Sequence, residues 1–311
     1  MPATLLEPLP SHPNILLKRE DLSETGSHKW RYLKPRLEQL KKEGVTQVVI
    51  STSGNAGITA SHYGKKLGIK VLCLVSEHGE MDKAAAIEQE GGFLVATSHP
   101  IHWAKYFSRK YGIHNLRGSE DPDAIEHYKT LGKEIIEQAP DANAVVNFCS
   151  SGISTLGILR SYEEWAIDEN NATHIPRFIL AQNGRGAGLV HLLKTEELPN
   201  GYENEHPGPP DLPLRVGLYR ELCRLIGNDW RDAYYVTNDQ IDDMQTRFFT
   251  ARESAASLFI AKYLLRKGTL EGEKVVVIIS GKAWTPVDFR PNHSIESIQD
   301  ADNIYRTFCT I

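Results

Sequence analysis

Six short runs of β-branched and other apolar residues recur along the chain, separated by segments with helical periodicity. The runs are residues 45–50, 70–75, 93–96, 144–149, 178–181 and 275–279. Each has the length and composition of a strand that is buried on both faces. The helical segments are residues 58–67, 81–90, 102–111, 122–138 and 155–165. Alternating strands and helices of this size predict parallel βαβ units, and so an α/β fold with open parallel sheets.

Three other stretches have a less regular pattern. Residues 15–17 are apolar and predict an edge strand or a lead-in to the first helix. Residues 247–267 predict one long helix with an apolar face. Residues 195–213 are rich in Glu, Asn, Gly and Pro, which is typical of a mobile flap or a surface excursion.

Composition excludes several classes of function. The chain has 311 residues, of which 41% are hydrophobic and 24% charged, as in a soluble globular enzyme. A formal charge of -5 gives no reason to expect nucleic acid or an anionic membrane as a partner. No apolar run reaches the length of a membrane span, and the N-terminus lacks a leader pattern. The four cysteines form no Cys-x-x-Cys pair, so we expect reduced thiols and a cytoplasmic protein. The 12 histidines show no ligand spacing, so we expect no metal.

Lys29 stands at the start of a predicted helix. Residues 25–27 form a turn, and the Ser27 hydroxyl is placed to accept from free backbone N–H groups one turn on. The helix would continue from Trp30 to Leu40. The positive end of the peptide dipoles disfavours another positive charge in the first turn, so a partly buried amine there could form imines. The alternative is a solvated lysine, because Lys is mostly exposed.

Small polar residues follow three of the predicted strands. Ligands of open parallel sheets bind beyond the carboxyl ends of the strands. The loop at 51–57 could form a nest of N–H groups for an anion, although such a loop is more often an ordinary turn. The loop at 150–155 enters a helix, whose N-terminus suits a phosphate. Ser280 and Gly281 follow the last strand.

Five separated segments resemble, in order, the pyridoxal-phosphate enzymes of fold type II. Residues 18–29 are similar to the cofactor-lysine segment of tryptophan synthase β chains, and the continuation to Leu33 resembles aminocyclopropanecarboxylate deaminase and D-cysteine desulfhydrase. Residues 52–58 resemble the substrate loop of cysteine synthases. Residues 126–135 resemble the helix that precedes the phosphate loop, and residues 176–182 a strand of threonine synthase. The fifth segment is Ile279-Ser280-Gly281.

This resemblance implies a fold type II architecture, with two open parallel-sheet α/β domains and pyridoxal 5'-phosphate in the cleft between them. The small mobile domain would cover residues 35–146. The large, cofactor-binding domain would combine residues 1–34 with 147–311. The resemblance also implies a small amino acid as substrate and a homodimer.

The resemblance assigns a role to each strand end. Lys29 would be the catalytic residue and would carry the cofactor as a Schiff base. Asn55 would hydrogen-bond the ring hydroxyl, and Ser280 would be a neutral partner of the pyridine nitrogen. The phosphate would be held by Ser150, Ser151, Gly152, Ile153, Ser154 and Thr155. The substrate carboxylate would be held by Thr52, Ser53, Gly54 and Ala56.

Two positions depart from the family pattern. Ala56 stands where relatives have Thr, which removes one hydroxyl contact and leaves the substrate open. Ile153 replaces a glycine, and it would crowd the phosphate if the backbone there needs a positive φ. These departures support a rival reading, in which a non-catalytic descendant binds the cofactor or a partner protein without turnover.

The motifs do not agree on one reaction. Cysteine-synthase-like β-replacement leads, and threonine synthase and serine/threonine dehydratase are close alternatives. A neutral hydroxyl at the ring nitrogen suits elimination and replacement at the β-carbon. Residues 253–256 resemble a pocket segment of dehydratases, although the first turn of a helix explains them equally well. A nucleotide-binding dehydrogenase is disfavoured, because residues 183–188 lack the Gly-x-Gly-x-x-Gly spacing.

Overall fold

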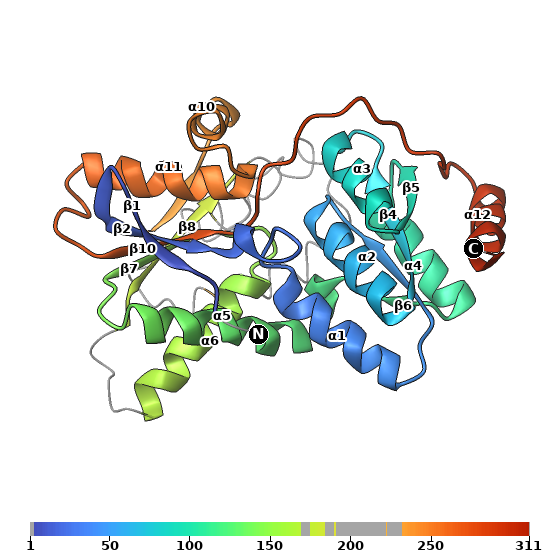
Figure 1. Cartoon of the computed structure of the whole chain (residues 1–311), viewed down its shortest axis with the longest axis horizontal. Coiled ribbons are helices and arrows are strands. Elements are labelled where there is room, and N and C mark those ends of the chain that lie inside the picture. The colour runs from blue at the N-terminus through green and yellow to red at the C-terminus, as the bar shows by residue number, and fades with distance from the viewer. Residues whose placement is uncertain (1–2, 169–174, 184–189, 191–221, 223–231, 311) are drawn as a thin grey trace. The chain divides into compact units, whose positions relative to one another are not determined.

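The computed structural model describes residues 3–168, 175–183, 190, 222 and 232–310, and the chain divides into two compact units (Figure 1). The first unit comprises Met1–His28 and Pro122–Ala283, and the second comprises Lys29–Asp121 and Trp284–Ile311. The expected division at residues 35 and 147 therefore differs from the observed one. Residues 195–213, for which we predicted a flap or excursion, lie outside the described residues.

Packing accounts for the different boundaries. Helix α5 (Asp123–Gln138) packs on α6 (Ile153–Asp168), which keeps residues 122–146 in the first unit. Helix α12 (Ile298–Thr310) packs on α4 (Pro100–Tyr111), which places the C-terminal segment in the second unit.

The described strands of the first unit form a six-stranded sheet in the order β1-β2-β10-β7-β8-β9. Their bounds are Leu6–Leu9 (β1), His12–Arg19 (β2), Val275–Ile279 (β10), Ala144–Phe148 (β7), Arg177–Gln182 (β8) and Ala233–Tyr235 (β9). Strand β1 is antiparallel to β2, and the other neighbours are parallel. The carboxyl ends of β2, β10, β7 and β8 therefore lie along one edge of this sheet. Residues 15–17, expected at an edge, lie inside β2, which pairs on both sides.

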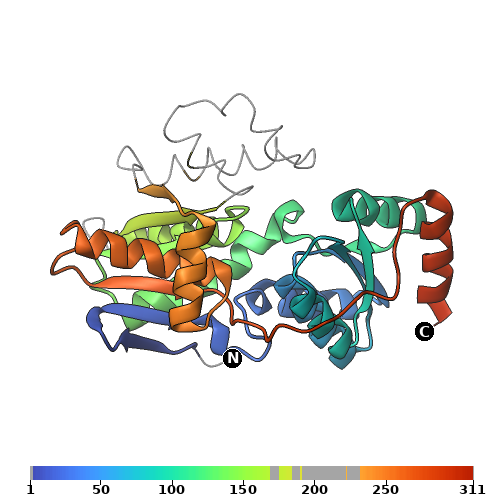
Figure 2. The same cartoon turned by 90° about the horizontal axis from the view of Figure 1, so that it is seen from above.

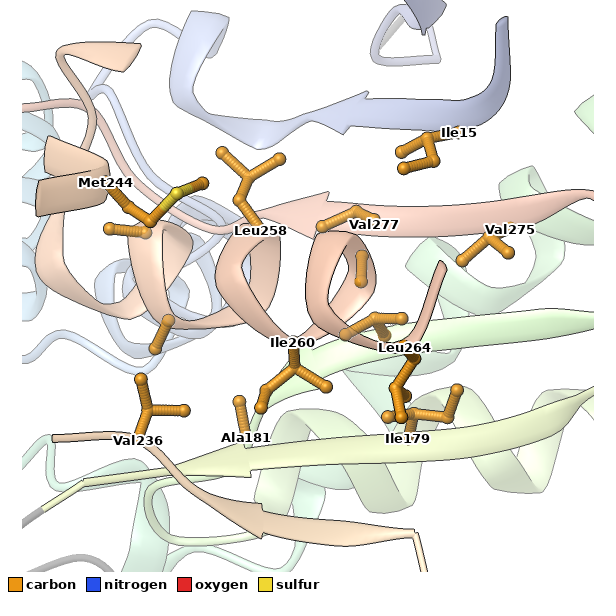
Figure 3. Packing of buried hydrophobic residues seen from close by; sticks show 14 of the residues in the cluster. Ile15, Ile179, Ala181, Val236, Met244, Leu258, Ile260, Leu264, Val275 and Val277 are labelled. Atoms are coloured by element: carbon orange, nitrogen blue, oxygen red, sulfur yellow. The ribbon is translucent and has the colours of Figure 1, made fainter. Parts of the chain in front are cut away.

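One face of this sheet packs against helix α11 (Arg252–Arg266), while α5 and α6 pack on each other at the opposite face (Figure 1). Figure 3 shows the layer between α11 and the strands, where Leu258, Ile260 and Leu264 of the helix meet Val277 and Ile179 of the sheet. All five side chains are at most 4% exposed. The β-branched strands predicted from the sequence thus form this core.

The described strands of the second unit form a parallel sheet in the order β5-β4-β3-β6. Their bounds are Phe93–Thr97 (β5), Lys70–Ser76 (β4), Gln47–Ser51 (β3) and His114–Asn115 (β6). Beside α12, this unit contains α1 (Trp30–Lys42), α2 (Asn55–Leu67), α3 (Met81–Gln89) and α4. The loops after β3 and β4 lie at the carboxyl edge of this sheet.

The C-terminal segment extends this second unit. Residue Ala96 of β5 pairs with Ser294, its N–H donating to His293 O at 2.9 Å, and Ile295 N donates to Ala96 O at 3.1 Å. Helix α12 then lies beside α4 (Figure 2), and Phe308 and Phe107 belong to one buried hydrophobic cluster. The segment thereby covers the open edge of β5, an arrangement that prevents edge-to-edge association.

The helix predicted at residues 247–267 is confirmed from Arg252 to Arg266 (α11), but its predicted start is wrong, because the chain breaks between two helices at residues 249–251. Helix α10 (Asn238–Phe248) ends at Phe249, which has a φ of 45°. Thr250 then pairs with Lys282, and Ala251 N donates to Gly281 O at 3.3 Å. This pairing with a distant segment interrupts the helical hydrogen bonds, and α11 begins only at Arg252.

Among the described residues, no helix is long and apolar enough to span a membrane. In the same part of the chain, no group of three or more His, Cys, Asp or Glu side chains could hold a metal ion. Cys73 and Cys149 are buried free thiols. Burial raises the pKa of Cys73 to about 12, which makes this thiol unreactive.

Candidate active site

The Lys-Arg-Glu motif that begins at residue 18 anchors the chain ahead of Lys29. The buried Lys18 ammonium donates to Glu134 and Gln138 of α5, both at 2.7 Å, and to the carbonyl of Thr4 at 2.9 Å. The Thr4 hydroxyl in turn donates to Glu20 at 2.6 Å. A buried ammonium requires such compensation, so these residues are structural.

The turn before Lys29 is closed by Ser23 rather than by Ser27. The Ser23 hydroxyl accepts from Ser27 N at 3.0 Å and donates to Ser27 O at 3.1 Å. We predicted that Ser27 caps the helix, and this is wrong: its hydroxyl is buried without a hydrogen-bond partner among the described residues. Helix α1 begins at Trp30, so Lys29 is its N-cap residue and lies just ahead of the first turn.

This turn is held against the carboxyl end of β10. The N–H of His28 donates to Ser280 O at 2.9 Å, and Nδ1 of the same ring lies 2.9 Å from that oxygen. Ser27 pairs with Gly281 as an isolated β-bridge. These contacts fix His28 beside Ser280, which is 5% exposed. Lys29 is the next residue in the chain.

The Ser254 hydroxyl holds the other side of the β10 end. It donates to Gly281 O at 3.0 Å and accepts from Gly281 N at 3.2 Å. A hydroxyl can do both at once, since it carries one hydrogen and two lone pairs. Ser254 belongs to the segment 253–256 that resembles dehydratases, and its observed contact is with the backbone of Gly281.

The loop between β7 and α6 has the geometry of an anion site. Gly152 has a φ of 91°, and Ile153, the first residue of α6, has no positive φ. Leu156 N donates to Gly152 O at 2.8 Å, so Gly152 lies at the helix start. The first amides of an α-helix have no acceptor within the helix and suit a phosphate. The positive φ in this loop therefore falls on Gly152, and the backbone of Ile153 does not need one.

Thr155 belongs to this loop but faces inward. It is fully buried, and its hydroxyl accepts from Asn147 Nδ2 of β7 at 2.9 Å. The side chain of Ile153 is also buried, at 5% exposure. These two side chains fix the start of α6, so backbone groups are what this part of the loop offers a phosphate.

The loop between β3 and α2 is tightly wound around Thr52. The Thr52 hydroxyl oxygen accepts from Gly54 N at 2.9 Å and from Gly57 N at 3.0 Å, which leaves the hydroxyl hydrogen for a ligand. Gly54 has a φ of 142°. Asn55 begins α2, and its Oδ1 is buried without a partner in the described part of the chain. Such an orphaned polar atom is costly unless a ligand satisfies it.

A cavity of about 220 Å³ adjoins this loop at the carboxyl ends of β3 and β4. Its lining is formed by Thr52, Ser53, Gly54, Val75, Ser76, His78, Gly79, Glu80, Met81 and Ala84. The cavity therefore combines the loop with the start of α3, and it presents both hydroxyl and charged groups.

These groups fit the chemistry of pyridoxal phosphate. Helix-start amides after Gly152 suit the phosphate, and the orphaned Asn55 amide suits the ring hydroxyl. Ser280, which carries a neutral hydroxyl, accepts a hydrogen bond at its carbonyl oxygen from the residue that precedes Lys29. The phosphate loop belongs to the first unit and Asn55 to the second. In both loops the residues with a positive φ are glycines.

A family model described as pyridoxal-phosphate dependent enzyme matches residues 2–281. The chain belongs to this family. It is an α/β enzyme of fold type II, and its cofactor is pyridoxal 5'-phosphate. The resemblance inferred from the sequence motifs is thereby confirmed.

Curated relatives include dehydratases and a synthase. A serine dehydratase-like protein of Mus musculus is 28% identical over 182 residues, which cover 56% of this chain and 52% of the relative. L-threonine dehydratase catabolic TdcB of Staphylococcus aureus is 22% identical, covering 86% and 78%. Threonine synthase of a Bacillus species is 29% identical, covering 41% and 38%. The chain matches about half the length of the first of these relatives.

Solved structures agree on the fold. A pyridoxal 5'-phosphate-dependent aspartate racemase has a TM-score of 0.70 at 20% identity, covering 92% of this chain and 91% of the other. Maize serine racemase has a TM-score of 0.71 at 15% identity, covering 99% and 92%. At this identity the match shows the fold alone.

The structure gathers the predicted residues in two groups. The first unit brings Ser280 and the loop 150–155 to one sheet edge, and the second unit brings the loop 52–56 beside the cavity. Sequence reasoning missed His28 and the α3 start as neighbours of these groups, and it included Ser254 only within the segment 253–256. The position of His28 directly before Lys29 was a usable signal, whereas the contacts of Ser254 required the folded chain.

Proposed function

We propose that this chain catalyses elimination at the β-carbon of a small amino acid, with serine or threonine as the substrate that loses water and then ammonia. The observation that carries the proposal concerns Ser280. This residue has a neutral hydroxyl, and its backbone carbonyl is hydrogen-bonded to His28, the residue before Lys29. A neutral partner at the ring nitrogen suits β-elimination, because full charge delocalisation into the ring is not required. Relatives that are serine and threonine dehydratases support this choice.

Each predicted residue then has a task. Lys29 binds the cofactor through its Nζ and afterwards accepts the proton from the substrate's α-carbon at the same atom. Asn55 and Ser280 orient the ring, and the residues 150–155 hold the phosphate. The loop residues Thr52, Ser53, Gly54 and Ala56 hold the substrate carboxylate. Pyridoxal phosphate supplies the electron sink when bound.

The overall reaction is balanced without another cofactor. The α-proton and the β-hydroxyl leave serine as water, and one water molecule then replaces the amine as ammonia. The products are a 2-oxo acid and ammonium. No oxidant or reductant takes part.

Cysteine-synthase-like β-replacement is a second candidate, and the loop at residues 52–58 favours it. That loop resembles cysteine synthases more than dehydratases. The sequence motifs placed this reaction first, whereas we place dehydration first because relatives that are dehydratases support it. Threonine synthase is the third reaction to assay, given the relative with that activity.

The first experiment measures the visible absorption of the protein with pyridoxal phosphate, for wild type, Lys29→Ala and Lys34→Ala. Lys34 lies on α1 and pairs with Glu38, which makes it a matched lysine outside the proposed site. A cofactor band that borohydride fixes to residue 29, and that only the Lys29 variant lacks, supports the assignment. Absence of the band in wild type would overturn the proposal and favour a non-catalytic binding protein.

The second experiment separates the reactions by product. The holoenzyme is given serine, threonine, O-acetylserine with sulfide, or O-phosphohomoserine. A 2-oxo acid and ammonia from serine or threonine support dehydration. Cysteine from O-acetylserine, without ammonia from serine, would instead establish β-replacement.

We extend the proposal to a homodimer, which the family resemblance suggests. Light scattering coupled to size-exclusion chromatography tests it. A mass twice the 34.9 kDa of the chain is expected.

A further inference from the structure

Lys83 occupies an unusual place at the start of α3. It is the third residue of the helix, and the whole residue is 3% exposed. Its ammonium pairs with a carboxylate oxygen of Glu80, the N-cap residue, at 3.0 Å. The Glu80 side chain is 41% exposed and lines the cavity beside the loop 52–54.

Local stability does not explain this lysine. A positive charge in the first turn of a helix is opposed by the peptide dipoles. Burial of an ammonium also costs free energy, which a surface lysine does not incur. A residue that breaks two local rules together is more often found at a functional site.

The side chain of Lys83 lies directly over Gly54. A Cβ atom at Gly54 would be 2.2 Å from Cδ and 2.6 Å from Cβ of Lys83, far inside contact distance. Gly54 has a φ of 142°, a conformation that residues other than glycine rarely adopt. The aliphatic part of Lys83 therefore occupies the space that a side chain at Gly54 would need.

We propose that Lys83 is a positioning residue for the substrate-carboxylate loop, with its aliphatic part packed over Gly54 and its ammonium fixed by Glu80. The proposal rests on the proposed function, in which the amides of this loop bind the carboxylate of an amino acid. The Thr52 hydroxyl holds the loop from inside through Gly54 N and Gly57 N. Lys83 holds it from outside, so the amides keep their directions before the substrate arrives.

Two substitutions separate packing from charge. Lys83→Met keeps an unbranched chain over Gly54 and removes the ammonium, while Lys83→Ala removes both. Lys65→Ala is the matched control, since Lys65 packs beside another glycine of positive φ in the same unit, Gly91, where an added Cβ would lie 3.3 Å from Lys65 Cδ. Gly91 lies in the turn before β5, and it does not line the cavity.

The first readout is amide hydrogen exchange of the peptide that spans residues 52–57, in protein without substrate. Lys83→Ala is expected to accelerate exchange in this peptide, while β3 and β4 stay protected. Lys83→Met and Lys65→Ala are expected to match wild type. This readout needs no turnover, so it tests Lys83 even if the proposed reaction is wrong.

The second readout is kinetic and uses the holoenzyme. Lys83→Ala is expected to raise KM for the amino acid about tenfold with kcat nearly unchanged, because displacing a donor to a charged group costs about that factor. Lys83→Met is expected to restore most of the affinity. Lys65→Ala is expected to leave both constants unchanged.

Three results would overturn the proposal. One is unchanged exchange and KM in Lys83→Ala. Another is a Lys83→Met variant as impaired as Lys83→Ala, which would assign the effect to charge instead of packing. The third is faster exchange throughout the second unit in Lys83→Ala, which would mean a general loss of stability.

Discussion

The backbone N–H and the ring Nδ1 of His28 both lie 2.9 Å from the carbonyl oxygen of Ser280. A carbonyl can only accept, so Nδ1 carries its hydrogen and the ring is fixed in orientation. The backbone of Ser280 is thereby anchored on one side, and Ser254 anchors Gly281 on the other. Neither anchor uses the Ser280 hydroxyl, which can therefore be removed without displacing the strand end.

Ser280→Ala is expected to weaken the binding of pyridoxal phosphate by about two- to tenfold, the net value of one neutral hydrogen bond. Titration of the cofactor followed by absorption measures the change. Ser257→Ala is the control, since Ser257 is a buried serine of α11 that donates to Glu253 O. Equal affinity in wild type and Ser280→Ala would show that this hydroxyl does not face the cofactor.

Ser254→Ala should act on stability first. The buried N–H of Gly281 loses its acceptor, while Gly281 O keeps the bonds from Thr250 and Ala251. An unsatisfied buried donor costs about 1–3 kcal/mol of unfolding free energy. Urea unfolding measures this loss, and Ser254→Thr, which keeps the hydroxyl, should recover part of it. A variant as stable as wild type would mean that water or a backbone shift satisfies Gly281.

Ile153→Gly tests which residue of the phosphate loop needs a left-handed backbone. Because Gly152 already has the positive φ, we expect cofactor affinity within about threefold of wild type. Stability should fall by about 2–5 kcal/mol, the usual loss for removing a buried aliphatic side chain. Gly152→Ala should do the reverse and weaken cofactor binding, since a left-handed Ala costs about 1–2 kcal/mol. A gain in affinity for Ile153→Gly would contradict the observed geometry.

The sheets could be predicted from the sequence because their strands are buried on both faces. Residues 275–279 are an unbroken β-branched run and residues 144–149 are mostly apolar, and they contain the neighbouring strands β10 and β7. The small polar residues after each run indicated the ligand side, since parallel strands end at the same edge. This rule pointed to Ser280 and Gly152, and the family resemblance gave each its role.

Features set by distant pairing could not be predicted in this way. The break between α10 and α11 depends on Thr250 meeting Lys282, which no local pattern reveals. Ser27 has the right residue type for a cap, yet its pairing with Gly281 keeps it out of the helix. In the sequence Lys83 is indistinguishable from a surface lysine, and only the folded chain shows that it packs on Gly54.

Asp302 of α12 joins this helix to α4 through its carboxylate. It accepts hydrogen bonds from Lys110 at 2.6 Å, from Tyr106 at 3.0 Å and from Tyr111. The bond from Lys110, with that from Tyr111, lowers the pKa of Asp302 from 3.8 to about 2. Since the folded pKa is below the unfolded one, this stabilisation is present above about pH 4 and is lost as the pH falls to about 2.

Asp302→Asn should therefore lower the melting temperature at pH 7 by a small amount, because the pair is exposed and screened. The difference from wild type should shrink between pH 4 and pH 2, whereas Asp288→Asn, an exposed acid of the same segment, should show none. A difference that stays constant down to pH 2 would show that the charge of Asp302 does not hold α12 in place.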